Sequence, residues 1–242
     1  MKNFKDDELI KHIESAISQL NILLHDLINT NTKRAVLLGY WIKDYTSYIR
    51  KEDSYEQPKY KYNRGDVVQI NFGYRIGREI GGRHFAVVID NSNSINQETI
   101  TVVPLMSLKE KSKNGKFTFI LNKGLYELHN DKLNKLLNSF DSHLKEIESL
   151  MQEENDSKEK FELIKSKLSK SKRELNELKA FKKSHQKLKS GSIIDVGQIV
   201  TVSKMRLLNP KNAKDSLSKI KLSNEDLDLL NNKLKTLYIN KY

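Results

Sequence analysis

The spacing of apolar residues predicts two helices at the start of the chain. Between residues 7 and 29, apolar side chains recur at alternating steps of three and four, which keeps them on one helical face. Residues 32–51 have the same period and a broad, aromatic-rich face, which predicts a packing role. Residues 53–58 break the period, and Pro58 disfavours helix at the residue before it. A boundary is therefore expected there.

After this boundary the pattern changes to that of short strands. Runs of β-branched and aromatic residues alternate with turns rich in glycine and asparagine, which is typical of a small barrel or sandwich. The expected strands are residues 66–72, 85–91, 100–103 and 116–121. Strand character resumes at residues 192–196, directly after Gly191.

The long stretch between these two strand regions, residues 125–189, contains neither proline nor glycine. It holds two segments with apolar residues at heptad spacing, separated by a polar stretch in which Asn155, Asp156 and Ser157 form a plausible turn and helix cap. We therefore expect an antiparallel coiled-coil hairpin that packs or contacts a partner. One continuous helix is the structural alternative. A last amphipathic helix is expected after the cap motif that begins at Ser223.

Together these patterns predict an α+β fold in which a small β-barrel is interrupted by a helical hairpin, with helices at both ends of the chain. A chain of 242 residues is long enough for one ordinary domain with helical additions. The expected parts are an N-terminal helical region (1–56), a barrel (57–124 and 190–210), a hairpin insertion (125–189) and a C-terminal helical segment (211–242).

The formal net charge is +12, and it is unevenly distributed. Residues 58–124 contribute +6 and residues 190–211 contribute +2. Clustered cations suit a polyanionic partner because they release condensed counterions from phosphates, although a basic chain also gains solubility. The absence of cysteine excludes disulfides and thiolate metal sites and fits the reducing cytoplasm. No apolar run has the length of a signal peptide or a membrane span.

Three blocks of the sequence resemble the MazF/PemK toxins. They are residues 64–72 with 76–89, residues 99–107, and residues 192–207, the last with Gln-Ile-x-Thr and Lys-x-Arg elements. The resemblance covers roughly residues 60–124 and 190–210 and leaves the helical additions outside. It implies an SH3-like (MazF/PemK-like) β-barrel, usually a homodimer, that cleaves single-stranded messenger RNA and is silenced by a cognate antitoxin.

The chemistry implied by the resemblance needs no metal and no cofactor. The ribose 2′-hydroxyl attacks the adjacent phosphate, which leaves a 2′,3′-cyclic phosphate and a 5′-hydroxyl. This reaction requires a base, an acid and support for the phosphate. The chain departs from the family pattern at two positions: His84 stands where the family has its catalytic arginine, and Met106 stands where the family has a threonine.

The candidate catalytic residues are therefore His84, Arg83, Glu79 and Ser107. A histidine can exchange protons near neutral pH and, once protonated, can support a phosphate. Arg83 has a planar fork suited to phosphate, but in an extended segment it would point away from the face of His84. Glu79 matches the family's loop glutamate, and it could equally be a charge partner for the arginines around it. Ser107 could donate a hydrogen bond to the phosphate.

The candidate RNA-binding residues are Arg75, Arg78, Gly81, Gly82, Lys204 and Arg206. The two glycines would let the backbone approach RNA, or they form a turn. Gln198 is interpreted as mainly architectural. Two alternatives remain open. In the first, Met106 favours a non-catalytic barrel whose basic groove binds nucleic acid or a protein, with the hairpin as docking arm. In the second, the N-terminal helices cover that groove and act as a built-in silencer.

Overall fold

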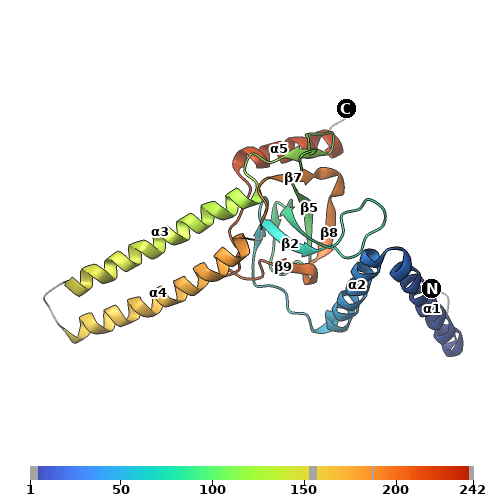
Figure 1. The fold of residues 1–242 in the computed structure, drawn as a ribbon, viewed down its shortest axis with the longest axis horizontal. Helices are drawn as coiled ribbons and strands as arrows, with labels where there is room; N and C mark the ends of the chain where they lie inside the picture. The colour runs from blue at the N-terminus through green and yellow to red at the C-terminus, as the bar shows by residue number, and fades with distance from the viewer. Residues whose placement is uncertain (1–4, 153–156, 187, 240–242) are drawn as a thin grey trace. The chain divides into compact units, whose positions relative to one another are not determined.

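The computed structural model describes residues 5–152, 157–186 and 188–239 and shows a mixed fold of helices and antiparallel strands (Figure 1). The chain divides into two compact units. The first contains Met1–Glu56 and Phe72–Gly82, and the second contains Gln57–Asn71 and Arg83–Tyr242. Within the described ranges, no helix is both long and apolar enough to cross a membrane.

The first unit begins with two helices, as the apolar spacing predicts. They are α1 (Asp6–Thr30) and α2 (Thr32–Lys51), followed by the short 3-10 helix η1 (Glu52–Ser54). Asn31 is the single residue between α1 and α2, and it caps both. Its backbone N–H donates to Leu27 O, and its side chain accepts from the N–H of Arg34.

The segment Phe72–Gly82 packs against α2 within the first unit. Gly73 has φ +75°, and a Cβ at this position would lie 2.7 Å from the ring of Trp41. Both the backbone conformation and the contact therefore require glycine. Arg34 Nε also donates to Tyr74 Oη. Residues 72–82 are thus attached to the second helix of the same unit.

The second unit contains the strands. They are β1 (Tyr62–Asn63), β2 (Val67–Asn71), β3 (Arg83–Val88), β4 (Ser92–Asn93), β5 (Thr99–Ser107), β6 (Thr118–Ile120), β7 (Ser192–Asp195), β8 (Val200–Ser203) and β9 (Leu207–Asn209). Short 3-10 turns, η2 (Val196–Gln198) and η3 (Lys204–Arg206), join the last three. The predicted strands are confirmed with shifted ends; the one expected at 85–91 begins at Arg83, and β5 is longer than expected.

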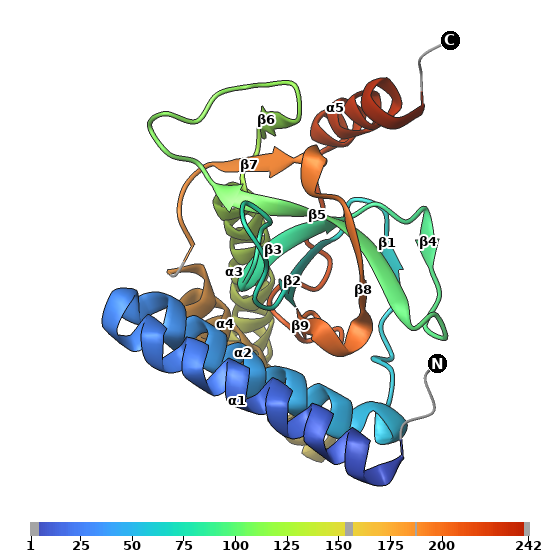
Figure 2. The same cartoon turned by 90° about the vertical axis from the view of Figure 1, so that its right-hand side faces the viewer.

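All strand pairings are antiparallel, and the sheet order is β6-β7-β5-β3-β2-β9, with β8 also paired to β5 and a separate pair β1-β4 (Figure 2). β5 pairs with β3 along one edge and with β7 and β8 along the other. In the described chain the order ends at β6 and β9, so the sheet is open. The closed barrel that the resemblance implies is not confirmed by this pairing.

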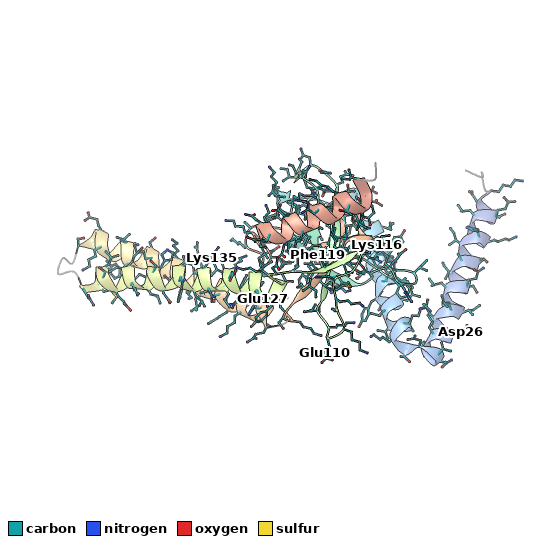
Figure 3. All side chains as sticks on the ribbon, turned by 90° about the horizontal axis from the view of Figure 1, so that it is seen from above. Asp26, Glu110, Lys116, Phe119, Glu127 and Lys135 are labelled. Atoms are coloured by element: carbon teal, nitrogen blue, oxygen red, sulfur yellow. The ribbon has the colours of Figure 1, made fainter. Side chains whose placement is uncertain are left out.

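The insertion between β6 and β7 contains α3 (Leu125–Gln152) and α4 (Lys158–His185), which lie side by side (Figures 1 and 3). Contacts between the helices run in opposite sequence directions, which makes them antiparallel and excludes one continuous helix. These contacts are His129–His185, His143–Glu174 and Glu146–Lys167. Of the predicted turn residues, Asn155 and Asp156 lie outside the described ranges.

The main core lies between one face of the sheet, the base of this insertion and α5 (Asn224–Leu234). It joins Val87 and Ile194 of the sheet to Leu125 of α3, Phe181 of α4 and Leu230 of α5. As predicted, Ser223 caps α5, because its side chain accepts from the N–H of Asp226. A π-helical turn, η4 (Lys235–Ile239), follows α5.

Candidate functional site

The predicted loop residues Arg75, Arg78, Glu79, Gly81 and Gly82 all belong to the first unit. Glu79 forms an ion pair with Arg75, with 3.7 Å between Oε2 and Nη1. Arg75 also donates from Nε to the carbonyl oxygen of Phe72 at 3.1 Å. This geometry agrees with the interpretation of Glu79 as a charge partner for its neighbours.

Gly81 and Gly82 are each required by the structure, for different reasons. A Cβ on Gly81 would lie 2.8 Å from the carbonyl oxygen of Gly73, which is too close. Gly82 has φ +81°, and its N–H donates to Gly73 O at 2.7 Å. The two glycines therefore lie where the ends of the segment Phe72–Gly82 meet, and larger side chains there would introduce a clash or backbone strain.

His84 and Arg83 are neighbours in β3, so their side chains point to opposite faces of the sheet. The last pair between β3 and β5 is Phe85 with Leu105. If the same register is continued, the next position places His84 opposite Met106, and the one after it places Arg83 opposite Ser107. His84 is half-buried and also pairs with Ile70 of β2, whereas Arg83 is exposed.

The three predicted catalytic residues that lie in strands, His84, Arg83 and Ser107, do not share one face of the sheet. Arg83 and Ser107 belong to one row and His84 and Met106 to the next, and neighbouring rows project to opposite faces. A shared role for His84 with Arg83 or Ser107 in one pocket is not supported. The row that carries His84 is the row in which the family has its arginine and threonine.

The closing block, residues 192–207, returns to the sheet beside β2. Its two cations, Lys204 and Arg206, form hydrogen bonds within the fold. Lys204 is fully buried; its Nζ donates to Ser94 O at 2.6 Å and lies 5.6 Å from the ring centroid of Tyr62. Burial lowers the pKa of Lys204, and the carboxylate of Asp90 partly offsets this effect. An ammonium in this position has no surface to offer RNA, so the interpretation of Lys204 as an RNA contact is corrected.

Arg206 has a similar internal partner. Its Nε donates to the carbonyl oxygen of Asn71 at 2.8 Å, at the end of β2, and its side chain is half-buried. Leu207, the next residue, pairs with Ile70, which pairs on its other side with His84. The closing segment and His84 thus flank the same residue of β2.

A pocket that sequence analysis missed lies where β6, η2 and the C-terminal turn meet. Its volume is about 430 Å³, and it is lined by Lys116, Phe117, Thr118, Asp195, Gly197, Gln198 and Tyr238. Thr118 pairs with Asp195, and Asp195 lies two residues from Ile193, the partner of Met106. Because side chains two apart in a strand share a face, Asp195 lies on the sheet face that carries His84.

Two exposed aromatic residues of this pocket, Phe117 and Tyr238, have defined contacts. The ring of Phe117 packs against Gly197, where a Cβ would lie 3.2 Å from it, and Tyr238 donates from Oη to Val196 O at 3.0 Å. Lys116 Nζ lies 5.2 Å from the Phe117 ring centroid, which is a cation–π distance. Lys116 lies beside α5 (Figure 3), and Lys233 of that helix donates to its carbonyl oxygen at 3.0 Å.

The acidic group of the pocket is Asp195. Its carboxylate accepts from the N–H of Gly197 at 3.0 Å, and burial raises its pKa although this hydrogen bond opposes the change. The lining thus combines aromatic faces, a cation, a carboxylate, an amide and a hydroxyl. Its residues come from three segments separated by about eighty and forty positions, a grouping that no local sequence pattern reveals.

Comparison with known proteins agrees with the resemblance. Residues 63–170 match a family model described as "PemK-like, MazF-like toxin of type II toxin-antitoxin system". The match includes β2, β3, β5, β6 and α3 and enters α4, so it extends into helices that the sequence blocks left outside, and it ends before β7. No curated protein matches the chain. Over residues 63–170, the chain is therefore similar to the PemK-like, MazF-like toxins of type II toxin–antitoxin systems.

Proposed function

We propose that this chain is a toxin-like endoribonuclease that cleaves single-stranded messenger RNA without a metal and is neutralised by an antitoxin. The observation that carries the proposal is the family match over residues 63–170. The excess positive charge of the strand region supports it, because phosphate contacts provide most of the affinity for nucleic acid. The proposal includes a homodimer, which the resemblance implies.

In the proposed reaction the 2′-oxygen of one ribose bonds to the adjacent phosphorus while the bond from phosphorus to the 5′-oxygen breaks. The 2′-hydroxyl loses its proton to a base, and the departing 5′-oxygen receives one. The products are a 2′,3′-cyclic phosphate and a 5′-hydroxyl. We assign one of these proton transfers to His84, because an imidazole can take up or release a proton near neutral pH.

The pocket of Phe117 and Tyr238 is proposed to hold a base of the same strand. Single-stranded RNA is recognised by stacking of unpaired bases on aromatic rings and by hydrogen bonds to their edges. Phe117 offers an exposed ring with 43% of its surface accessible, and Asp195, Gln198 and Thr118 offer polar groups around it. Asp195 and His84 share a sheet face, so one strand of RNA could follow that face.

A second candidate function is a non-catalytic barrel that binds RNA or protein. Met106 favours it, because a thioether in the family's threonine position supplies no hydrogen-bond donor beside His84. The binding function predicts a salt-sensitive complex with intact RNA, whereas the nuclease predicts time-dependent cleavage.

One incubation distinguishes the two functions. Purified full-length chain is mixed with end-labelled unstructured RNA in EDTA, and the new ends are mapped. Cleavage with cyclic phosphate ends that falls about 100-fold or more in His84→Ala supports the nuclease. Arg83→Ala, one residue away on the other sheet face, is the matched control and should retain most activity. Intact RNA bound by the wild-type chain would establish the binding function instead.

A further inference from the structure

The two N-terminal helices leave a continuous apolar surface uncovered. Along α1, Leu27 is buried near the connection to α2, but Ile17 and Ile13 further away have 62% and 48% of their surface exposed. The same gradient runs along α2, where Ala35 is buried while Tyr45 and Ile49 are 53% and 51% exposed. Figures 1 and 3 show why: the helices diverge from their connection.

The exposed positions are complementary to one another. Counting outward from the buried residues Leu27 and Ala35 in antiparallel register, four apolar positions on one face of α1 meet four apolar positions of α2. The matched positions are Leu24 with Leu38, Leu20 with Ile42, Ile17 with Tyr45, and Ile13 with Ile49. The pairs nearest the connection are at least half-buried, and the outer two pairs are open.

The connection between the two helices is shorter than usual. Antiparallel helix pairs are normally joined by two to five residues, but here Asn31 stands alone between Thr30 and Thr32. Its hydrogen bonds to Leu27 O and from Arg34 N–H hold it to both helices. Thr30 and Thr32 also donate their hydroxyls to carbonyl oxygens one turn earlier, at Asp26 and Ile28.

The charges of α1 and α2 indicate which partner surface covers their exposed apolar residues. α1 contains five acidic residues and one basic residue, whereas α2 contains five basic residues and one acidic residue. The acidic first turn of α1 and the basic last turn of α2 both lie at the open end. Two copies of α1 side by side would repel, whereas α1 of one copy beside α2 of another attracts.

We propose that the N-terminal helices of two copies of this chain exchange, so that α1 of each copy packs on α2 of the other in a four-helix bundle. In this arrangement Ile13 and Ile17 are covered by Ile49 and Tyr45 of the second copy. A short connection that prevents closure within one chain is the usual origin of such an exchange. The exchange does not depend on RNA cleavage.

Because the chain contains no cysteine, the arrangement can be tested by disulfide trapping. Full-length Ile13→Cys and Ile49→Cys proteins with different tags are mixed, allowed to exchange and oxidised. The exchange predicts that the mixed disulfide dimer is the main product. Ser18→Cys mixed with Ile49→Cys is the matched control, because Ser18 lies on the opposite face of α1 and should give little product.

A second measurement tests whether the exposed apolar residues are covered by the other helix of the same chain instead of by a second copy. The double variant Ile13→Cys/Ile49→Cys is oxidised at low concentration, with and without four inserted Gly/Ser residues after Asn31. The proposal expects a disulfide within the chain only in the lengthened variant, together with a loss of the mixed dimer. A disulfide within the original chain would mean that each hairpin closes on itself. Absence of the mixed dimer in the first experiment would mean that another surface covers these helices; either result overturns the proposal.

Discussion

Nδ1 of His129 lies 3.2 Å from Nδ1 of His185, and this hydrogen bond joins α3 to α4 at the base of the insertion. His129 is fully buried and stacks on Phe181 with 3.8 Å between ring centroids, while the ring of His185 lies at a tilt against Tyr126 with 4.4 Å between centroids. A hydrogen bond between two Nδ1 atoms requires that one of them carries no proton. The contact therefore exists only while the pair is not fully protonated.

Mild acid is expected to destabilise the fold through this pair. Burial lowers the pKa of His129 to about 4, with further contributions from the nearby His185 and Lys132. Because the unfolded imidazole binds its proton at higher pH, stability is complete above about pH 6.5 and falls as the pH drops towards 4. The loss is at most about 3 kcal/mol. Urea unfolding at pH 7 and pH 4.5 measures it.

The control for the acid effect is His129→Phe, which retains an aromatic ring and cannot be protonated. Its free energy of unfolding should change less between pH 7 and pH 4.5 than that of the wild type. An equal change in both proteins would assign the acid sensitivity to other groups.

Lys132 is expected to stabilise the turn that follows β9. Its Nζ donates to Ser218 O at 2.7 Å and to Ser216 O at 3.1 Å, and burial lowers its pKa to about 8. Lys132→Met removes these donors and should cost about 1–3 kcal/mol in unfolding free energy. Lys135→Met, one turn along α3 (Figure 3), replaces an exposed ammonium and should cost under about 0.5 kcal/mol. Equal costs would contradict the assigned role.

Met106→Thr is expected to increase RNA cleavage. The substitution introduces a hydroxyl into the row of His84, in the position where the family has a threonine, and one such donor typically changes turnover by about 100-fold. We expect a gain on the order of tenfold in the initial rate of cleavage. Ser107→Thr, on the opposite face, should leave the rate unchanged. If both variants behave alike, the distinction between the two rows has no catalytic meaning.

Phe117→Ala is expected to weaken RNA binding without unfolding the protein. Loss of one stacked base costs about 1–3 kcal/mol, which corresponds to roughly five- to 150-fold in Kd. Fluorescence anisotropy with a short unstructured RNA, at fixed salt, measures the change. Phe161→Ala removes another exposed ring, on α4, and should have no effect. Unchanged binding by Phe117→Ala would argue against the proposed base pocket.

The helices were predictable because their signals are local. The repeat of apolar residues predicted α1, α2 and α5 to within a few residues, and Ser223 marked the start of the last helix. The ends of β3 and β5 were less predictable, since strand length depends on partners distant in sequence. Arg83, for example, is in the strand because it pairs with Asn71 of β2.

The candidate site was harder to predict than the fold. Lys204 has the sequence character of a surface cation, and only the three-dimensional structure reveals that Ser94 and Tyr62 enclose it. Residue spacing could indicate that Arg83 and His84 alternate, but not that Ser107 shares the row of Arg83. The pocket of Phe117 and Tyr238 depends on the return of the chain after a long insertion, which leaves no trace in residue spacing.

The two ends of that insertion meet. A Cβ on Gly124 would lie 3.0 Å from the Cα of Gly191, and Leu121 N–H donates to Ser192 O at 2.9 Å. A segment that leaves and rejoins a sheet at one point can gain or lose whole helical turns at its far end without shifting the strands. In evolutionary terms, the reach of this arm can therefore change independently of the sheet, so a new binding partner could be acquired at little cost to the rest of the molecule.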